Sequence, residues 1–96
     1  MTSNVPAASI MVRPPRGPNG RTITVTGSGW LPGIDVRVAY YSALGNPTSQ
    51  STATADSRGH FTVNLAAEDP TLVPGRHRIV ATNGDQTATG YYDASA

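Results

Sequence analysis

Cysteine is absent from this chain of 96 residues, and so is lysine. Without cysteine there are no disulfide bonds and no thiolate metal sites, so a domain of this size must be held by one compact core. All seven basic residues are arginine, and they are scattered along the sequence. Because nucleic-acid binding needs a clustered basic face, usually with interleaved aromatic residues, we do not expect it here.

Long hydrophobic runs are lacking as well. The apolar runs are only a few residues long, too short to span a bilayer, so membrane insertion is not expected. The first twenty residues lack the early positive charge and the apolar stretch of a secretory signal, so we expect no export by that route. Hydrophobic residues make up 38% of the chain and charged residues 14%, which favours a folded domain over a disordered chain.

Alternation of apolar and polar residues with a period of two runs through most of the chain and predicts β-strands. Seven candidate strands cover residues 8–13, 22–26, 34–41, 50–55, 60–65, 76–82 and 86–92. The side chains expected in the core are Ile23, Val25, Trp30, Val36, Val38, Phe61, Val63, Leu65 and Ile79. Short strands at such regular spacing predict an all-β, antiparallel two-sheet sandwich, with a small closed barrel as the alternative.

The connections between these strands carry turn signals. Asn83-Gly84 predicts a type I′ turn that joins the last two strands. Pro32-Gly33 and Pro74-Gly75 each predict a type II turn. In the segment from Asp56 to Gly59, the Asp56 carboxylate is expected to accept hydrogen bonds from nearby backbone amides. One short helical turn is predicted over residues 66–71.

We divide the chain into residues 1–20, an N-terminal arm with the first strand and a Pro/Gly-rich loop, and residues 21–96, the remainder of the single domain. The density of proline and glycine predicts that residues 14–20 form a loop. Pro14, Pro15 and Arg16 in this loop are candidate interface residues.

Trp30 is the only tryptophan, and it lies between Gly27-Ser-Gly29 and Pro32-Gly33. Two hypotheses fit: a ring that stacks on a ligand in a pocket, or a ring that plugs the core at a corner of the sheet. Glycines before the ring let the backbone bend, and the Pro-Gly turn reverses the chain. We favour the corner.

Two tyrosine pairs, Tyr40-Tyr41 and Tyr91-Tyr92, lie in predicted strands. Alternation sends one ring of each pair inward and leaves Tyr41 and Tyr91 as candidate surface rings. Exposed tyrosines are common interface anchors, which makes both candidate interface residues. A pair of rings that merely covers the sheet is an equally good alternative.

Ionisable residues do not suggest a catalytic or metal-binding constellation. His60 is expected to be exposed and His77 to face the core, on different strands. Calcium at Asp56 or at Glu68-Asp69 is less plausible than a turn-forming Asp56 and solvated charges at 68–69. We therefore expect neither enzymatic activity nor a metal or cofactor.

Four segments, taken in order, resemble the bacterial and phage immunoglobulin-like domains. They are ITVTGSGWLPG at 23–33, VRV at 36–38, ADSRGHFTV at 55–63 and PGRHRIVAT at 74–82, and the likeness extends over residues 21–92. The resemblance implies an immunoglobulin-like, seven-stranded antiparallel β-sandwich without a disulfide. It also implies a binding or structural module, found in bacterial surface proteins or on phage virion proteins.

Two functions follow as expectations. The first is a structural or accessory protein of a phage virion, assembled in the host cytoplasm, which decorates the capsid or sits on the tail. It would dock on capsid or tail subunits through residues 1–20, and deleting these residues would leave the rest folded. The second is an extracellular adhesion or carbohydrate-binding module, part of a larger bacterial surface protein, whose partners are cell-surface glycans.

Overall fold

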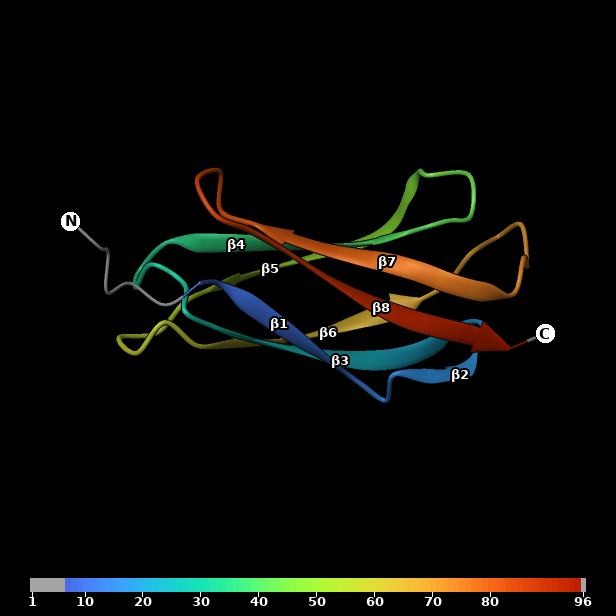
Figure 1. Cartoon of the computed structure of the whole chain (residues 1–96), viewed down its shortest axis with the longest axis horizontal. Coiled ribbons are helices and arrows are strands. Elements are labelled where there is room, and N and C mark those ends of the chain that lie inside the picture. The colour runs from blue at the N-terminus through green and yellow to red at the C-terminus, as the bar shows by residue number, and fades with distance from the viewer. Residues whose placement is uncertain (1–6, 96) are drawn as a thin grey trace.

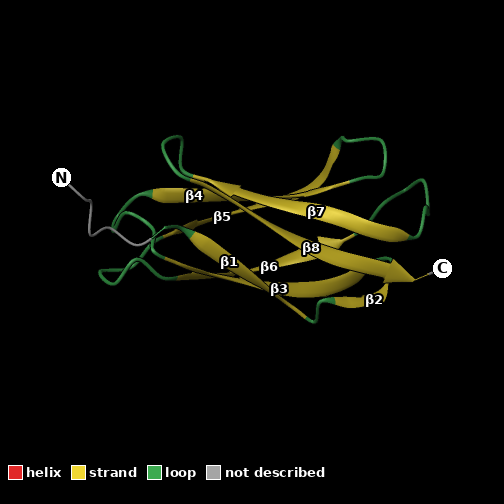
Figure 2. Cartoon of the chain, viewed as in Figure 1, coloured by secondary structure: helices red, strands yellow, loops and turns green. Residues whose placement is uncertain are grey.

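The structure is a computed structural model that describes residues 7–95, and within this range the chain consists of strands and loops without a helix. Eight strands form two separate sheets that pack face to face (Figures 1 and 2). One sheet has three strands in the order β1-β3-β6, and the other has five in the order β2-β8-β7-β4-β5. The predicted all-β, two-sheet sandwich is confirmed, with eight strands in place of seven.

The three-stranded sheet contains β1 (Ser9–Arg13), β3 (Arg21–Ser28) and β6 (Phe61–Ala67). The central strand β3 pairs antiparallel with both neighbours. Every second residue points to the other sheet, as the alternation predicts. The buried apolar residues of this sheet are Val12, Ile23, Val25, Phe61, Val63, Leu65 and Ala67.

The five-stranded sheet contains β2 (Arg16–Pro18), β8 (Thr87–Ser95), β7 (Gly75–Thr82), β4 (Asp35–Tyr41) and β5 (Pro47–Thr54). All its pairings are antiparallel except that of β2 with β8, which is parallel. The apolar residues that this sheet buries against the other are Val36, Val38, Tyr40, Ile79, Ala81, Tyr92 and Ala94.

The extra strand is β2, and the prediction that residues 14–20 form only a loop is wrong. The backbone amide of Asp93 donates to the carbonyl of Pro15 at 2.9 Å, and the Tyr92 hydroxyl donates to the carbonyl of Pro18 at 3.0 Å. Proline is tolerated on an edge strand, where a missing N–H faces solvent. Three residues are too few to show a period, which is why the pattern did not reveal this strand.

The positions of β1 and β2 also change what a truncation would do. β1 is a strand of the three-stranded sheet and β2 one of the five-stranded sheet, so each sheet takes one strand from the first twenty residues. Val12 of β1 lies in the core. Deleting residues 1–20 therefore removes structural strands, and we expect the remainder to lose its fold, contrary to the expectation from sequence.

Two of the predicted turns occur, one of them with a different backbone. The amide of Ile34 donates to the carbonyl of Leu31 at 3.4 Å and Gly33 has a φ of 78°, as a type II turn requires. β7 and β8 do form a hairpin, but among the described residues Leu72 is the only non-glycine with positive φ, so Asn83 cannot form the predicted type I′ turn. Instead the Asn83 side-chain oxygen accepts from the amides of residues 85 and 86.

The segment between β6 and β7 differs more from its prediction. Ala66 and Ala67 complete β6, so residues 66–71 do not form a helical turn. The chain reverses where the amide of Leu72 donates to the carbonyl of Asp69 at 2.9 Å, and Gly75 is already the first residue of β7. The predicted Pro74-Gly75 turn is therefore wrong. The Asp69 side chain explains the shift, because it accepts from the Thr71 amide at 2.9 Å and closes its own turn.

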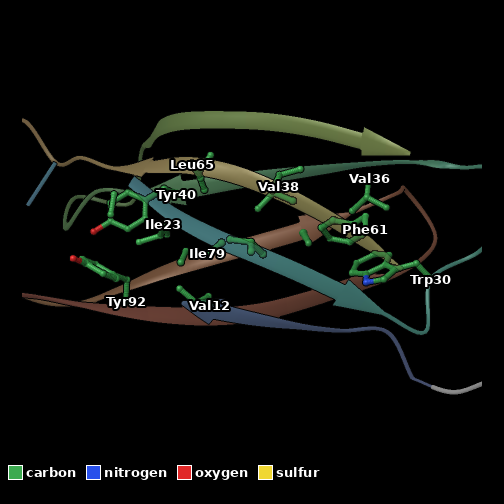
Figure 3. Close-up of a cluster of buried hydrophobic side chains, with 14 of the residues drawn as sticks. Val12, Ile23, Trp30, Val36, Val38, Tyr40, Phe61, Leu65, Ile79 and Tyr92 are labelled. Carbon is green, nitrogen blue, oxygen red and sulfur yellow. The ribbon is translucent and has the colours of Figure 1, made fainter. Parts of the chain in front are cut away.

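All nine side chains predicted for the core are buried (Figure 3). Trp30 is only 2% exposed and packs edge-to-face on Phe61, with ring centroids 5.7 Å apart. Its Nε1–H donates to the carbonyl of Ser9 at 3.1 Å. Gly59 has a φ of 76°, and a Cβ there would lie 2.4 Å from the carbonyl oxygen of Trp30, so the corner requires glycine at this position. The ring is a core plug and not a surface for ligand stacking.

Candidate functional site

One solvent-exposed sheet face gathers arginine and tyrosine side chains. Because side chains alternate along a strand, β4, β7 and β8 bury one set of residues and turn the other set outward. We call five of the outward residues the Arg/Tyr face; they are Arg37, Tyr41, Arg76, Arg78 and Tyr91. The face belongs to the five-stranded sheet, on the side away from the core.

Rings and cations alternate across this face. The guanidinium carbon of Arg78 lies 4.4 Å from the ring centroid of Tyr41, and that of Arg76 lies 5.1 Å from the ring centroid of Tyr91. Arg78 and Tyr91 are directly opposite each other on β7 and β8. The order across the three strands is therefore tyrosine, arginine, tyrosine, with Arg76 beside the second ring. Cation–π contacts restrict these long side chains before any partner arrives.

The charge of the Arg/Tyr face is positive at its centre. Arg76 has one acidic neighbour, with its Nε 3.9 Å from Asp93, and both side chains are well exposed, so the attraction is weak. Within residues 7–95, Arg37 and Arg78 form no ion pair. Asp35, at the start of β4, accepts a hydrogen bond from the hydroxyl of Thr54 instead.

The structure places the five predicted interface residues at two sites. Tyr91 is 50% exposed and Tyr41 is half-buried, and both lie on the Arg/Tyr face. Arg16 is exposed and pairs in register with Asp93 of β8, so it lies at the edge of the same sheet. Pro14 is half-buried and Pro15 exposed; both precede β2, and the carbonyl of Pro15 accepts from the amide of Asp93 at the same edge.

The sequence did not reveal that Arg37, Arg76 and Arg78 belong together. Their alternation with buried residues does predict that each points outward. Only the strand order, which puts β4 beside β7, turns scattered arginines into a surface cluster.

A second group of functional interest lies at the end of the core under this face. We call it the polar end; it comprises Tyr40, Asp69, His77 and Tyr92 (Tyr40 and Tyr92 are labelled in Figure 3). His77 is 3% exposed, as its inward position predicts, and its ring stacks on Tyr40 at 5.4 Å between centroids. Asp69 is fully buried, so the expectation that residues 68 and 69 are solvated loop charges is wrong for Asp69; Glu68 is exposed.

Hydrogen bonds hold the Asp69 carboxylate in place. It accepts from the hydroxyl of Thr71 at 2.7 Å and from the amide of Ala43 at 3.1 Å. The Thr71 hydroxyl, together with the backbone amides of Ala43 and Thr71, lowers the pKa of Asp69 against the opposing effect of burial. Burial raises the pKa of Tyr40 to about 12 and also raises the pKa of Tyr92.

Asp56 has the role that the sequence suggested. Its Oδ1 accepts from the amides of His60 at 2.9 Å and Arg58 at 2.8 Å, and these two bonds, that of His60 first, lower the pKa of Asp56. Across residues 7–95, no three histidine, aspartate or glutamate side chains gather into a group that would hold a metal ion. The same residues include no helix long and apolar enough to cross a membrane.

Comparison with known proteins identifies the fold alone. No family model matches the chain, and no curated protein matches its sequence. Among solved structures, macromomycin has a TM-score of 0.75 at 20% identity, over 93% of this chain and all of its own. The CARDB domain of a Pyrococcus furiosus protein, solved in complex with di-metal ions, has a TM-score of 0.56 at 15% identity, over 93% of this chain and 86% of its own. Both likenesses support the β-sandwich.

Proposed function

We propose that this chain is a non-enzymatic docking module with an immunoglobulin-like sandwich, seven strands of the family pattern plus the edge strand β2. In this proposal it is a structural or accessory protein of a phage virion, attached to capsid or tail subunits. The ordered resemblance of residues 21–92 to bacterial and phage immunoglobulin-like domains supports the class of protein. The Arg/Tyr face supports the mode of action.

The observation that carries the proposal is the arrangement of Tyr41, Arg78 and Tyr91 across three adjacent strands. Tyrosine and arginine are the residue types, with tryptophan, that contribute most to protein interfaces. Here they stand on a hydrogen-bonded sheet and not on loops, so little conformational entropy is lost when a partner binds. A rigid, laterally extended face suits attachment to another protein surface.

The fold changes the expectation that residues 1–20 dock on the partner as an arm. Residues 9–18 contain two strands of the sandwich, and residues 1–6 lie outside the described residues. We therefore assign the main contact to the Arg/Tyr face, with Arg16 at its edge as an additional contact. A deletion of residues 1–6 tests the remaining part of the N-terminus separately, because it leaves β1 and β2 intact.

The test is incorporation into particles. Mass spectrometry of phage particles purified from a culture that produces the chain should find it in fixed ratio to a shell or tail protein. The double variant Arg78→Ser, Tyr91→Ser should stay folded and be lost from particles, whereas Arg13→Ser, on the outer side of β1, should be incorporated normally. Absence of the chain from all particles, or normal incorporation of the double variant, would refute the proposal.

The half-exposed ring of Tyr91 favours a second candidate, a carbohydrate-binding module of a bacterial surface protein. Sugars stack on exposed aromatic rings, and Arg76 beside this ring offers hydrogen-bond donors. This function predicts saturable binding of cell-wall glycans by the isolated chain, abolished by Tyr91→Ser. A chain that is absent from particles and binds glycans in this way would establish the second candidate instead.

A further inference from the structure

We propose that the Arg/Tyr face recognises an acidic segment of a partner protein. This inference rests on the proposed function and adds the chemistry of the partner. It starts from the guanidinium groups of Arg37 and Arg78, which have no ion pair within the described residues although two acidic residues lie on the same sheet. Of these, Asp35 is bonded to Thr54 and Asp93 lies near Arg76.

The stacked arginines are suited to carboxylates. A guanidinium that contacts a ring through its face keeps its N–H donors at its edge, where a carboxylate accepts two hydrogen bonds at once. The guanidinium carbon of Arg78 lies over the ring of Tyr41 and that of Arg76 over the ring of Tyr91. Arg78 has no ion pair within the described residues, so it is the cation most available to a carboxylate of a partner.

The surroundings favour a protein segment over a phosphate polymer. Between Arg37 and Tyr41 lie the half-buried Val80 and the nearly covered Ala39, an apolar part of the face that a peptide side chain can cover. Three arginines with Asp93 among them give only a modest positive charge, whereas nucleic-acid binding needs many phosphate contacts.

Nuclear magnetic resonance with a hexaglutamate peptide tests this at low salt, with hexaglutamine as the matched neutral peptide. Hexaglutamate should shift the signals of Tyr41, Arg78 and Tyr91, and Arg78→Gln should weaken its binding about tenfold. Arg13→Gln, an arginine of the opposite sheet, should bind like the native chain. No shift with hexaglutamate, equal loss in both variants, or tighter binding of a single-stranded oligonucleotide would overturn the inference. If hexaglutamate fails but Arg78→Gln is still excluded from particles, docking stands and only the acidic partner is wrong.

A different observation, at the polar end, carries a second inference. The Nδ1 of His77 lies 3.0 Å from the carbonyl oxygen of Tyr41, and its Nε2 lies 2.9 Å from the carbonyl oxygen of Val73. A carbonyl oxygen only accepts hydrogen bonds, so both contacts are hydrogen bonds only if both ring nitrogens carry a proton. We infer that His77 is buried as a positively charged imidazolium.

The groups around the ring support this charge. The carboxylate Oδ2 of Asp69, from the segment between β6 and β7, lies 3.8 Å from Nδ1. Tyr40 of β4 stacks on the ring, and Tyr92 of β8 is the register partner of His77. Along β7 itself, the neighbours two positions away that share its face are apolar or glycine, and the arginines on either side point outward.

The protonated ring of His77 therefore acts as a clamp between two segments. It joins the end of β4, through the carbonyl of Tyr41, to the segment before β7, through the carbonyl of Val73. A neutral ring would leave one of these carbonyls facing a ring lone pair and Asp69 without its cation.

Nuclear magnetic resonance of the native chain tests the clamp through the couplings that a hydrogen bond transmits from a ring nitrogen to a carbonyl carbon. Both ring nitrogens of His77 should couple, one to the carbonyl of Tyr41 and the other to that of Val73. The exposed ring of His60 is the reference and should show neither coupling. A missing coupling at either ring nitrogen of His77 would overturn the inference.

Discussion

The two ends of the core are closed by different chemistry. At one end Trp30 packs on Phe61 (Figure 3), and the one polar atom of its side chain is bonded to the carbonyl of Ser9. At the other end, Tyr40 and His77 stack above the buried carboxylate of Asp69. The first end is held by apolar burial, which does not depend on pH. The second is held by hydrogen bonds to ionisable groups, so its stability should change with protonation.

This difference also has a consequence for function. The Arg/Tyr face lies over the polar end, because Tyr41, which Arg78 covers, provides the carbonyl that His77 binds. A change in the polar end can therefore reach the proposed docking surface through the backbone of β4. Variants at each end therefore distinguish a loss of core stability from an effect that reaches the proposed docking surface.

The largest effect is expected at the apolar end. Trp30→Ala should lower the free energy of unfolding by about 3–5 kcal/mol, since it leaves a cavity beside Phe61. The loss should be the same at pH 5 and pH 8, measured by denaturant unfolding followed by circular dichroism. Leu31→Ala, at a neighbouring residue that is 41% exposed, is the control and should change little. An unchanged melting temperature for Trp30→Ala would show that the ring is not a core plug.

The next largest effect is expected at the polar end. His77→Phe should retain the stacking on Tyr40 and lose both hydrogen bonds to backbone carbonyls, at a cost of about 2–3 kcal/mol. His60→Phe, at the exposed histidine, should stay within about 0.5 kcal/mol of the native chain. Both are measured by the same denaturant unfolding. Equal effects of the two substitutions would remove the distinction between the buried and the exposed histidine.

A smaller effect on the free energy of unfolding is expected when the pH is lowered. Because the pKa of Asp69 is lowered in the folded state, its charged form stabilises the fold above the ordinary carboxyl value of 3.8, and this stability is lost as the pH falls below it. The unfolding free energy should therefore decline on acidification, and Asp69→Asn should flatten this decline. Asp85→Asn, in the exposed hairpin loop, should leave the slope unchanged. A slope that Asp69→Asn does not alter would contradict this assignment.

The smallest effect separates the two buried tyrosines. Tyr92→Phe removes a hydrogen bond to the carbonyl of Pro18 and should cost about 1 kcal/mol. Tyr40→Phe should cost nothing measurable, because within the described residues the Tyr40 hydroxyl is buried without a partner. Thermal unfolding of both variants measures the difference. A greater loss for Tyr40→Phe would mean that its hydroxyl has a partner after all.

Alkaline pH gives a further readout for Tyr40. With its pKa raised to about 12, the neutral ring stabilises the fold below the ordinary value of 10.0, and this contribution is lost between 10.0 and about 12. Tyr40→Phe should remove that part of the alkaline loss of stability. An unchanged alkaline limb in this variant would assign the loss to other groups.

Local patterns predicted the apolar end of the molecule well. The alternation in β3, β4, β6 and β7 identified every core residue named from the sequence except Trp30, and the glycines around Trp30 identified the corner. The same alternation distinguished Tyr41 and Tyr91 from their buried neighbours. These features depend on residues close together in the chain, where side-chain direction follows from strand geometry.

The polar end and β2 could not be predicted in this way. Asp69 is buried because it bonds to Thr71 nearby and to Ala43, which is 26 positions away. The strand Arg16–Pro18 exists because β8, at the far end of the chain, offers it an edge. Such partners meet only in the folded chain, so local patterns predict a solvated charge at Asp69 and only a loop at residues 14–20.

By itself, the sequence determined where seven of the eight strands lie, which side of each is apolar, and that a lone tryptophan turns into the core, because these follow from the chain's local geometry. The tertiary structure alone decided which outward residues are neighbours. Strand order brings β4, β7 and β8 together, so arginines and tyrosines from three strands share one face, and a histidine meets two carbonyls and a carboxylate beneath it. Pairing between strands has no local signal, since it is settled by how whole sheets bury their apolar sides.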